Sequence, residues 1–213
     1  MRHEIVYLLG SFTAVFVIVD PFAVVPVYLA LTARLSADAI QRTRRKATLV
    51  AGGILVTFGA SGMAVFRLFG ITLPAFQIGG GILLVLLGIA QLNNVRARIK
   101  PEEQEEGEEK EDVSVFPLGM PLLAGPGAIS TLVLLSTRAG SFLRTAELVV
   151  ATCLALFAAY LVLKSAHFLL HLMGKTGLNL LTRIMGLILT ANGVQFMLTG
   201  IQGALKQMGV LVQ

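Results

Sequence analysis

An acidic residue followed by proline interrupts the first long apolar stretch of the chain. Residues 5–31 are apolar almost throughout, long enough to cross a bilayer as one tilted helix. Near the middle stand Asp20 and Pro21, and Pro26 follows five residues later. A charged side chain in the membrane costs about 3 kcal/mol or more, and a proline inside a helix costs about 3 kcal/mol. The sequence therefore predicts a function at this break.

The composition of the whole chain is also that of an integral membrane protein. Of the 213 residues, 55% are hydrophobic and 14% are charged, with a mean hydropathy of +0.81. A soluble domain of this length could not bury so much apolar surface. The net charge of +5 does not indicate a nucleic-acid partner, because the basic residues lie between apolar stretches rather than in one patch. Lipid headgroups account for them better.

The apolar stretches predict an all-α protein with six membrane spans, at about residues 5–32, 47–69, 75–94, 115–136, 146–166 and 180–205. The first is too long for a signal peptide and has no small-residue cleavage site, so we expect it to be retained. Connections after spans one, three and five hold twelve of the seventeen Lys and Arg residues. The positive-inside rule then places these connections in the cytoplasm and both termini outside the inner membrane.

A strongly acidic segment divides the chain into two halves. Eight of the twelve acidic residues lie within 102–112, and no core could form from them. We therefore predict a first three-helix repeat over 1–94, a solvated cytoplasmic linker over 95–114 and a second three-helix repeat over 115–213. A regulatory role for the linker is less expected than that of a spacer.

Similar spacings recur in the two halves. Pro121 and Pro126 stand one hundred residues after Pro21 and Pro26. Gly81 and Gly88 have the same separation as Gly186 and Gly193 in the last span, with Gln91 and Gln195 close behind. Because each half has an odd number of spans, the second must enter the membrane inverted. Inverted repeats whose helices break in corresponding spans are typical of secondary transporters, with substrate bound at the midplane where the breaks meet.

The chemistry of the first break depends on Asp20. In the simpler interpretation Asp20 is a helix N-cap and Pro21 the first helical residue, so the carboxylate satisfies backbone N–H groups. Asp20 is also the only acidic residue deep within a predicted span. It is therefore a candidate for coupling transport to protons or sodium, or for binding the ammonium group of a substrate.

The second break offers complementary chemistry. Gly125 and Gly127 allow the backbone to unwind, and Pro126 can begin a new helix whose free N–H groups favour an anion such as an amino-acid carboxylate. Ser130 and Thr131 could add hydroxyl donors, although bonding back to the preceding turn is equally expected. The remaining candidate substrate-binding residues are polar groups in apolar spans, for which hydrogen bonding between helices is the simpler explanation: Gln91, Asn192 and Gln195.

Metal and catalytic sites are not expected. His167 and His171 are spaced for one helix face, but no third ligand is near, so we expect neither a metal nor a cofactor. An intramembrane aspartyl protease needs two membrane carboxylates, and no G-x-S-x-G surrounds Ser130. Cys153 lies in an apolar run and is expected to pack without reacting. The sequence therefore does not predict an enzyme.

Three segments resemble signatures of the MarC family of bacterial and archaeal inner-membrane proteins. DPFAVVPVYLALT at 20–32 is similar to the family's first span, PLLAGPGAIST at 121–131 to its fourth, and MGLILTANGVQFMLTGI at 185–201 to its last. The resemblance covers nearly the whole chain, and the acidic stretch at 102–112 matches no motif. Some similar proteins are described as transporters of glycine and alanine, which implies a small neutral amino acid as substrate. An exporter of amino acids or other small metabolites is the alternative. Direction, coupling ion and a homo-oligomeric state stay open.

Overall fold

The computed structural model describes residues 2–92 and 112–209, and its regular structure in these ranges is helical throughout. The elements in chain order are α1 (Arg2–Val19), α2 (Pro21–Thr32), α3 (Ala37–Ser61), α4 (Ala64–Leu68), α5 (Leu73–Leu92), the π-type helix η3 (Ser114–Leu123), α6 (Pro126–Ala139) and α7 (Phe142–Gln207). The all-α prediction is confirmed for these residues. Of the predicted linker 95–114, only 112–114 lie within them.

Several helices are long and apolar enough to cross a membrane. Four such segments are Val6–Thr32, Leu73–Leu92, Phe142–Ala166 and Leu180–Gln207. A fifth crossing arises if η3 and α6, which bend by 53° at their junction, count as one broken span. These agree with five of the six predicted spans in position.

The second predicted span, 47–69, has the wrong boundaries. Its helix, α3, begins ten residues earlier at Ala37 because Ser36 caps it, accepting a hydrogen bond from Ala39 N at 3.3 Å. Most of the basic residues that the sequence placed between spans one and two therefore belong to the first turns of α3. The helix ends at Ser61 because Gly62 turns the chain with φ 55°, and α4 then forms separately. The charged beginning of α3 leaves a shorter apolar part than the prediction assumed.

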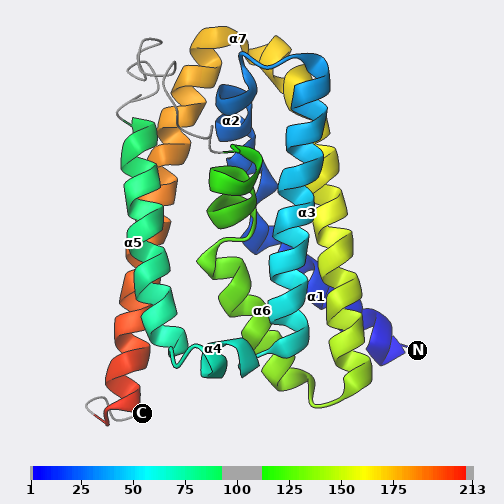
Figure 1. Ribbon diagram of the computed structural model, residues 1–213, viewed down its shortest axis with the longest axis vertical. Helices are drawn as coiled ribbons and strands as arrows, with labels where there is room; N and C mark the ends of the chain where they lie inside the picture. Colours follow the sequence, from blue (N-terminus) through cyan, green and yellow to red (C-terminus); the bar gives the residue numbers. More distant parts are fainter. Residues whose placement is uncertain (1, 93–111, 210–213) are drawn as a thin grey trace.

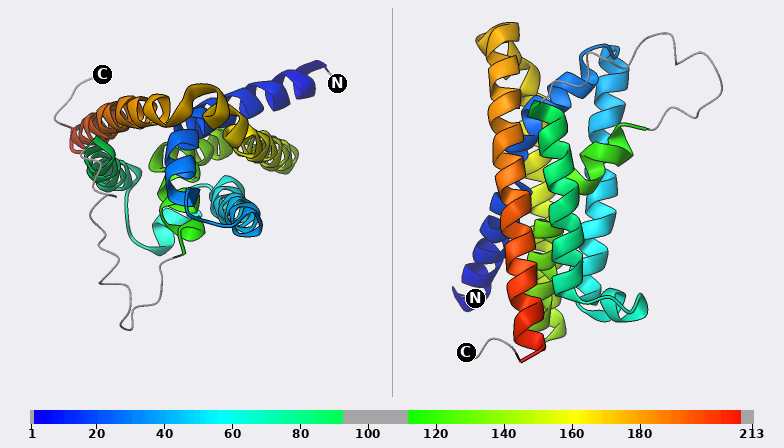
Figure 2. Two further views of the ribbon diagram at one scale, coloured as in Figure 1. Left: turned by 90° about the horizontal axis from the view of Figure 1, so that it is seen from above. Right: turned by 90° about the vertical axis from the view of Figure 1, so that its left-hand side faces the viewer.

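The helices form a bundle in which the two broken helices occupy the middle (Figure 1). α5 lies along the second part of α7 on one side, and α3 lies beside the first part of α7 on the other. α1 begins at the same end of the bundle at which α7 finishes (Figures 1 and 2). α7 reverses direction in the region of Gly174, where φ is 63°. The side chains of His167 and His171 lie outside the described residues.

The first break comes at Asp20, between α1 and α2. Asp20 N still donates to Phe16 O of α1 at 3.1 Å, so α1 runs up to the break. The next residue, Pro21, has no N–H to continue the helix, and it instead occupies the first turn of α2. The predicted interruption near the middle of span one is therefore confirmed.

The second break comes between η3 and α6. Ala124 leaves the helical conformation at φ −98° and ψ 61°, and Gly125 is extended before Pro126 opens α6. The prediction that the chain unwinds at Gly125 and Gly127 is confirmed for Gly125 only, because Gly127 is already helical in α6, and Pro126 restarts the helix as predicted. The predicted pairing of Pro21 with Pro121 is wrong, because Pro121 lies in η3 ahead of the break. Pro126 is the proline that starts a helix, as Pro21 does.

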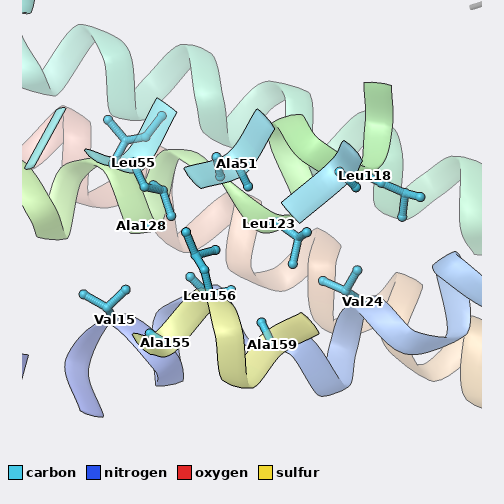
Figure 3. Close-up of a cluster of buried hydrophobic side chains, with 14 of the residues drawn as sticks. Val15, Val24, Ala51, Leu55, Leu118, Leu123, Ala128, Ala155, Leu156 and Ala159 are labelled. Atoms are coloured by element: carbon cyan, nitrogen blue, oxygen red, sulfur yellow. The ribbon is translucent and has the colours of Figure 1, made fainter. Parts of the chain in front are cut away.

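Small and branched apolar side chains fill the space between the broken helices and their neighbours (Figure 3). Ala51 and Leu55 of α3 are fully buried against this cluster. Ala155 and Ala159 of α7 are also fully buried, and their small side chains let helices approach closely. The core therefore holds both breaks between α3 and α7.

Glycines on α5 and α7 bring these two helices into backbone contact. A Cβ atom at Gly81 would lie 2.5 Å from Gly193 O, and one at Gly88 would lie 2.6 Å from Gly186 O. Both distances are shorter than real Cβ atoms adopt, so only glycine fits. The sequence singled out these four glycines as marks of a repeat, and the structure shows that they also form one interface.

Candidate functional site

A cavity of about 150 Å³ lies between the two helix breaks. Asp20 lines it from the first break, and Gly125, Pro126 and Gly127 line it from the second. Residues more than one hundred positions apart thus meet at one site. The rest of the lining is predominantly apolar and comes from α1, α2, η3, α5 and the second part of α7: Ile18, Val19, Val24, Val27, Leu84, Leu122, Met185, Ile188, Leu189 and Phe196 among others.

Asp20 has an unusual backbone conformation for its residue type. Its φ of 42° and ψ of 63° are left-handed, and among the residues described it is the only non-glycine with positive φ. Its Oδ1 accepts a hydrogen bond from Ala23 N at 3.3 Å, so it does cap α2 as predicted. The cap is not the ordinary extended one, since left-handed backbone costs a non-glycine residue about 1–3 kcal/mol. Strain of this kind is concentrated at functional sites.

The carboxylate of Asp20 is exposed although it lies near the middle of Val6–Thr32. Thr13 and Val17 on the preceding turns of α1 are exposed as well, but they face a shallow groove on the bundle surface that Asp20 does not line. A charged group at mid-span is tolerated where it faces a cavity that water can enter. The cavity therefore explains how the chain accommodates this charge.

The α6 end of the cavity lacks the cap that α2 possesses. Gly125 is the N-cap residue of α6 and has no side chain with which to accept a hydrogen bond. Gly125 O accepts from Ile129 N at 3.0 Å, which leaves the N–H groups of Gly127 and Ala128 in the unpaired first turn. Both residues line the cavity. The first turn of α6 thus presents the partial positive charge of a helix N-terminus to this space.

Two of the predicted polar residues also line the cavity. Gln91 comes from α5 and Asn192 from α7. The Oε1 atom of Gln91 is buried and has no hydrogen-bond partner among the described residues. A buried acceptor without a donor costs about 1–3 kcal/mol, so a ligand that donates a hydrogen bond would find a partner here. The simpler expectation, that Gln91 bonds a neighbouring helix through Oε1, does not hold.

The remaining predicted residues do not line the cavity. Pro21 and Pro26 are buried within α2, and Gln195 is exposed on α7. Ser130 is 7% exposed, and its Oγ has no hydrogen-bond partner in the described part of the chain, so it does not bond back to the preceding turn. Thr131 lines the surface groove between α1 and α6 instead. Of the eleven candidates, the structure thus brings six together: Asp20, Gly125, Pro126, Gly127, Gln91 and Asn192.

Sequence reasoning missed two residues that shape the cavity. Phe196 packs so closely on Gly127 that a Cβ atom there would lie 2.8 Å from the ring Cζ. At Gly80 a Cβ atom would lie 2.3 Å from Pro126 Cβ, so α5 holds the start of α6 in place. The triple glycine at 79–81 was a signal for close packing. Phe196 gave no such signal, because in the sequence a phenylalanine that faces a cavity cannot be told from one that faces lipid.

Comparison with known proteins identifies the kind of protein. The profile of the MarC family integral membrane proteins matches residues 5–205. A UPF0056 membrane protein of Aquifex aeolicus is 38% identical over 198 residues, covering 92% of each chain. UPF0056 membrane protein MJ1677 of Methanocaldococcus jannaschii is 36% identical, covering 95% of this chain and 99% of its own. UPF0056 membrane protein YhcE of Escherichia coli is 35% identical, covering 90% of each.

No solved structure matches the chain. The family match nonetheless spans both helix breaks, the cavity between them and the glycine interface of α5 and α7. The apolar helices agree with the membrane location that the family description states. This chain is an integral membrane protein and belongs to the MarC family.

Proposed function

We propose that this protein is a secondary transporter of small neutral amino acids of the glycine and alanine type. The observation that carries the proposal is the meeting of two helix breaks at one cavity, with a carboxylate on one side and a helix N-terminus on the other. Secondary transporters bind substrate in such a place, since interrupted helices expose backbone groups inside the membrane.

The two sides of the cavity complement the two charges of an amino acid. Asp20 would attract the ammonium group, and Gln91 Oε1 would accept one of its hydrogen bonds. The uncapped first turn of α6 would bind the carboxylate. In this arrangement the substrate carboxylate takes the place at α6 that the Asp20 carboxylate takes at α2.

The size of the cavity favours small side chains. A volume of about 150 Å³ is that of an engineered cavity that accepts benzene, a molecule with as many non-hydrogen atoms as alanine. Phe196 and Ile18 close over Gly127, so the chain leaves little room beside the α6 end. The apolar lining offers no partner for a charged or strongly polar side chain.

We further propose that the chain crosses the membrane six times as two inverted three-helix repeats, with α3 as the second crossing. An offset of 105 residues relates Pro21 to Pro126, Gly81 to Gly186 and Gly88 to Gly193. Under this correspondence the contact of Gly81 with Gly193 maps onto the contact of Gly186 with Gly88. Both contacts occur, as a two-fold relation between halves requires. Rocking of one half against the other would then open the cavity to each side in turn.

The proposal also includes the orientation of the protein in the membrane and the coupling of transport to an ion. The start of α3, which carries several basic residues, lies at the end of the bundle opposite the start of α1 (Figure 1). The positive-inside rule assigns that end to the cytoplasm of a cell's inner membrane, with both termini outside. Asp20 would couple transport to protons or sodium, because it is the ionisable group at the cavity.

Ligand binding to the purified protein tests this function. Glycine, alanine and serine should raise the melting temperature, because a ligand that binds the folded state stabilises it, whereas large amino acids and sugars should not. Each ligand is measured with and without sodium. Gly125→Ala, whose Cβ would lie 2.8 Å from Pro121 O at the break, should abolish the response, and Gly53→Ala, where the space is open, should keep it. A folded sample that responds to no amino acid would contradict the proposal.

A further inference from the structure

Arg44 is a buried arginine at the end of the bundle where α3 begins. It is 8% exposed. Its guanidinium carbon lies 4.8 Å from the centre of the Tyr160 ring, and Nη2 donates a hydrogen bond to the Tyr160 hydroxyl at 3.4 Å. Because Tyr160 belongs to α7, this contact joins α3 to the first part of α7. The residue is remote from the cavity described above, whose lining includes neither side chain.

The charge of Arg44 has no acidic partner among the residues that the structure describes. Its Nε is buried and has no hydrogen-bond partner within 2–92 and 112–209. Asp112 is paired with Lys46 instead. A tyrosine hydroxyl provides a hydrogen bond but no compensating charge. Since a buried unpaired ion costs several kcal/mol, Arg44 calls for an anion that the described chain does not supply.

The neighbouring side chains add positive charge rather than cancel it. Arg45 and Lys164 are exposed. Lys164 follows Tyr160 by four residues on α7 and therefore lies on the same helix face. Neither forms an ion pair within the described ranges. Because Arg45 adjoins Arg44 and Lys164 stands one helical turn from Tyr160, three cations gather at the junction of α3 and α7.

This cluster lies at the level where the apolar spans end. The basic turns of α3 finish at Lys46, and its apolar part begins at Ala47. On α7, Lys164 stands two residues before the end of the span Phe142–Ala166. At this depth long basic side chains reach the lipid headgroups, where phosphodiester groups are the abundant anions.

We propose that Arg44 and Tyr160, with Arg45 and Lys164, form a binding site for the phosphodiester of an anionic phospholipid. The planar guanidinium can direct two N–H groups at phosphate oxygens, and the two exposed cations add charge around it. A zwitterionic lipid carries the same phosphate, but its ammonium group would meet three cations. The site therefore prefers phosphatidylglycerol to phosphatidylcholine. The proposal does not depend on the transport function.

Thermal unfolding of the full chain in a neutral detergent tests this preference. Phosphatidylglycerol should raise the melting temperature by several degrees more than phosphatidylcholine does. Inorganic phosphate, which offers the same chemistry without acyl chains, should have a much smaller effect. Equal stabilisation by both lipids would overturn the proposal. Inorganic phosphate as effective as phosphatidylglycerol would overturn the assignment to a lipid.

Variants distinguish the site from general surface charge. Arg44→Gln should remove the preference for phosphatidylglycerol. Arg45→Gln and Lys164→Gln alter exposed residues and so should fold, and each should weaken phosphatidylglycerol binding about tenfold through the loss of one charge-assisted contact. Arg42→Gln is the matched control, an exposed arginine whose Nε donates to Asp38 O, and its binding should not change. A full preference in the Arg45→Gln/Lys164→Gln double variant would refute the site.

Discussion

Gly81 of α5 and Gly193 of α7 face each other through their backbones. A Cβ atom on either one would lie within 2.6 Å of the carbonyl oxygen of the other. The contact is reciprocal, and Gly88 and Gly186 repeat it two turns away. This interface holds α5 and the second part of α7 together, and both helices line the candidate site.

Alanine at this interface should destabilise the protein. Gly193→Ala is expected to cost about 1–3 kcal/mol of unfolding free energy, because the added methyl group forces two backbones apart. The measurement is reversible unfolding in detergent. Gly79→Ala is the control on α5, where a Cβ atom has no neighbour within 4 Å, and it should be neutral or slightly stabilising. Because alanine has a higher helix propensity than glycine, equal losses in both variants would show that the contact between Gly81 and Gly193 is not the cause.

Replacement of Asp20 by asparagine should separate coupling from folding. Asparagine tolerates the left-handed conformation and caps helices, so Asp20→Asn should melt close to the wild type. Uptake of glycine or alanine driven by an ion gradient into proteoliposomes should fall to background, because the ionisable group is gone. Unchanged gradient-driven uptake by a folded variant would exclude the coupling role. Uptake by vesicles of both orientations would compare import with export.

Narrowing the cavity at Gly127 should change selectivity. A Cβ atom there would lie 2.8 Å from Phe196 Cζ and 3.2 Å from Ile18 Cγ1. Gly127→Ala should therefore weaken alanine binding at least about tenfold, with a smaller effect on glycine, since one methyl group in a tight pocket has this effect. Calorimetric titration of both ligands measures the ratio. If both affinities fell by the same factor, the methyl group would not be acting through ligand size.

The ion pair between Lys46 and Asp112 should make stability depend on pH at the acidic end. The hydrogen bond from Lys46, followed by those from Ser114, lowers the pKa of Asp112 from 3.8 to about 2. The contribution to stability is thus complete above about pH 4 and is lost as the pH falls toward 2. Because the pair is exposed, the effect should be below about 1 kcal/mol.

Melting temperatures measured between about pH 6 and pH 2 check this dependence. Asp112→Asn should flatten the acidic limb of the profile relative to the wild type. Asp38→Asn, which removes a carboxylate from the first turn of α3, should leave that limb in place. A profile with the same acidic limb in Asp112→Asn would show that other carboxylates cause it.

The sequence by itself determined the helical class and both breaks. Long apolar runs favour helices that span a membrane. Because proline has no N–H to continue a helix, Pro21 and Pro126 determine locally where α2 and α6 begin. The family match confirms what three motifs indicated. The paired glycines at 81, 88, 186 and 193 were also visible as a spacing.

Tertiary structure decided which residues meet. Gln91 and Asn192 line the cavity, whereas Ser130 and Gln195 do not. The rotation of each helix about its own axis decides which of its polar side chains faces the cavity. It also decided the left-handed conformation of Asp20 and the burial of Arg44 beside Tyr160, on a helix 116 residues away in sequence. Neither follows from local pattern, because each is fixed by how helices distant along the chain pack against one another.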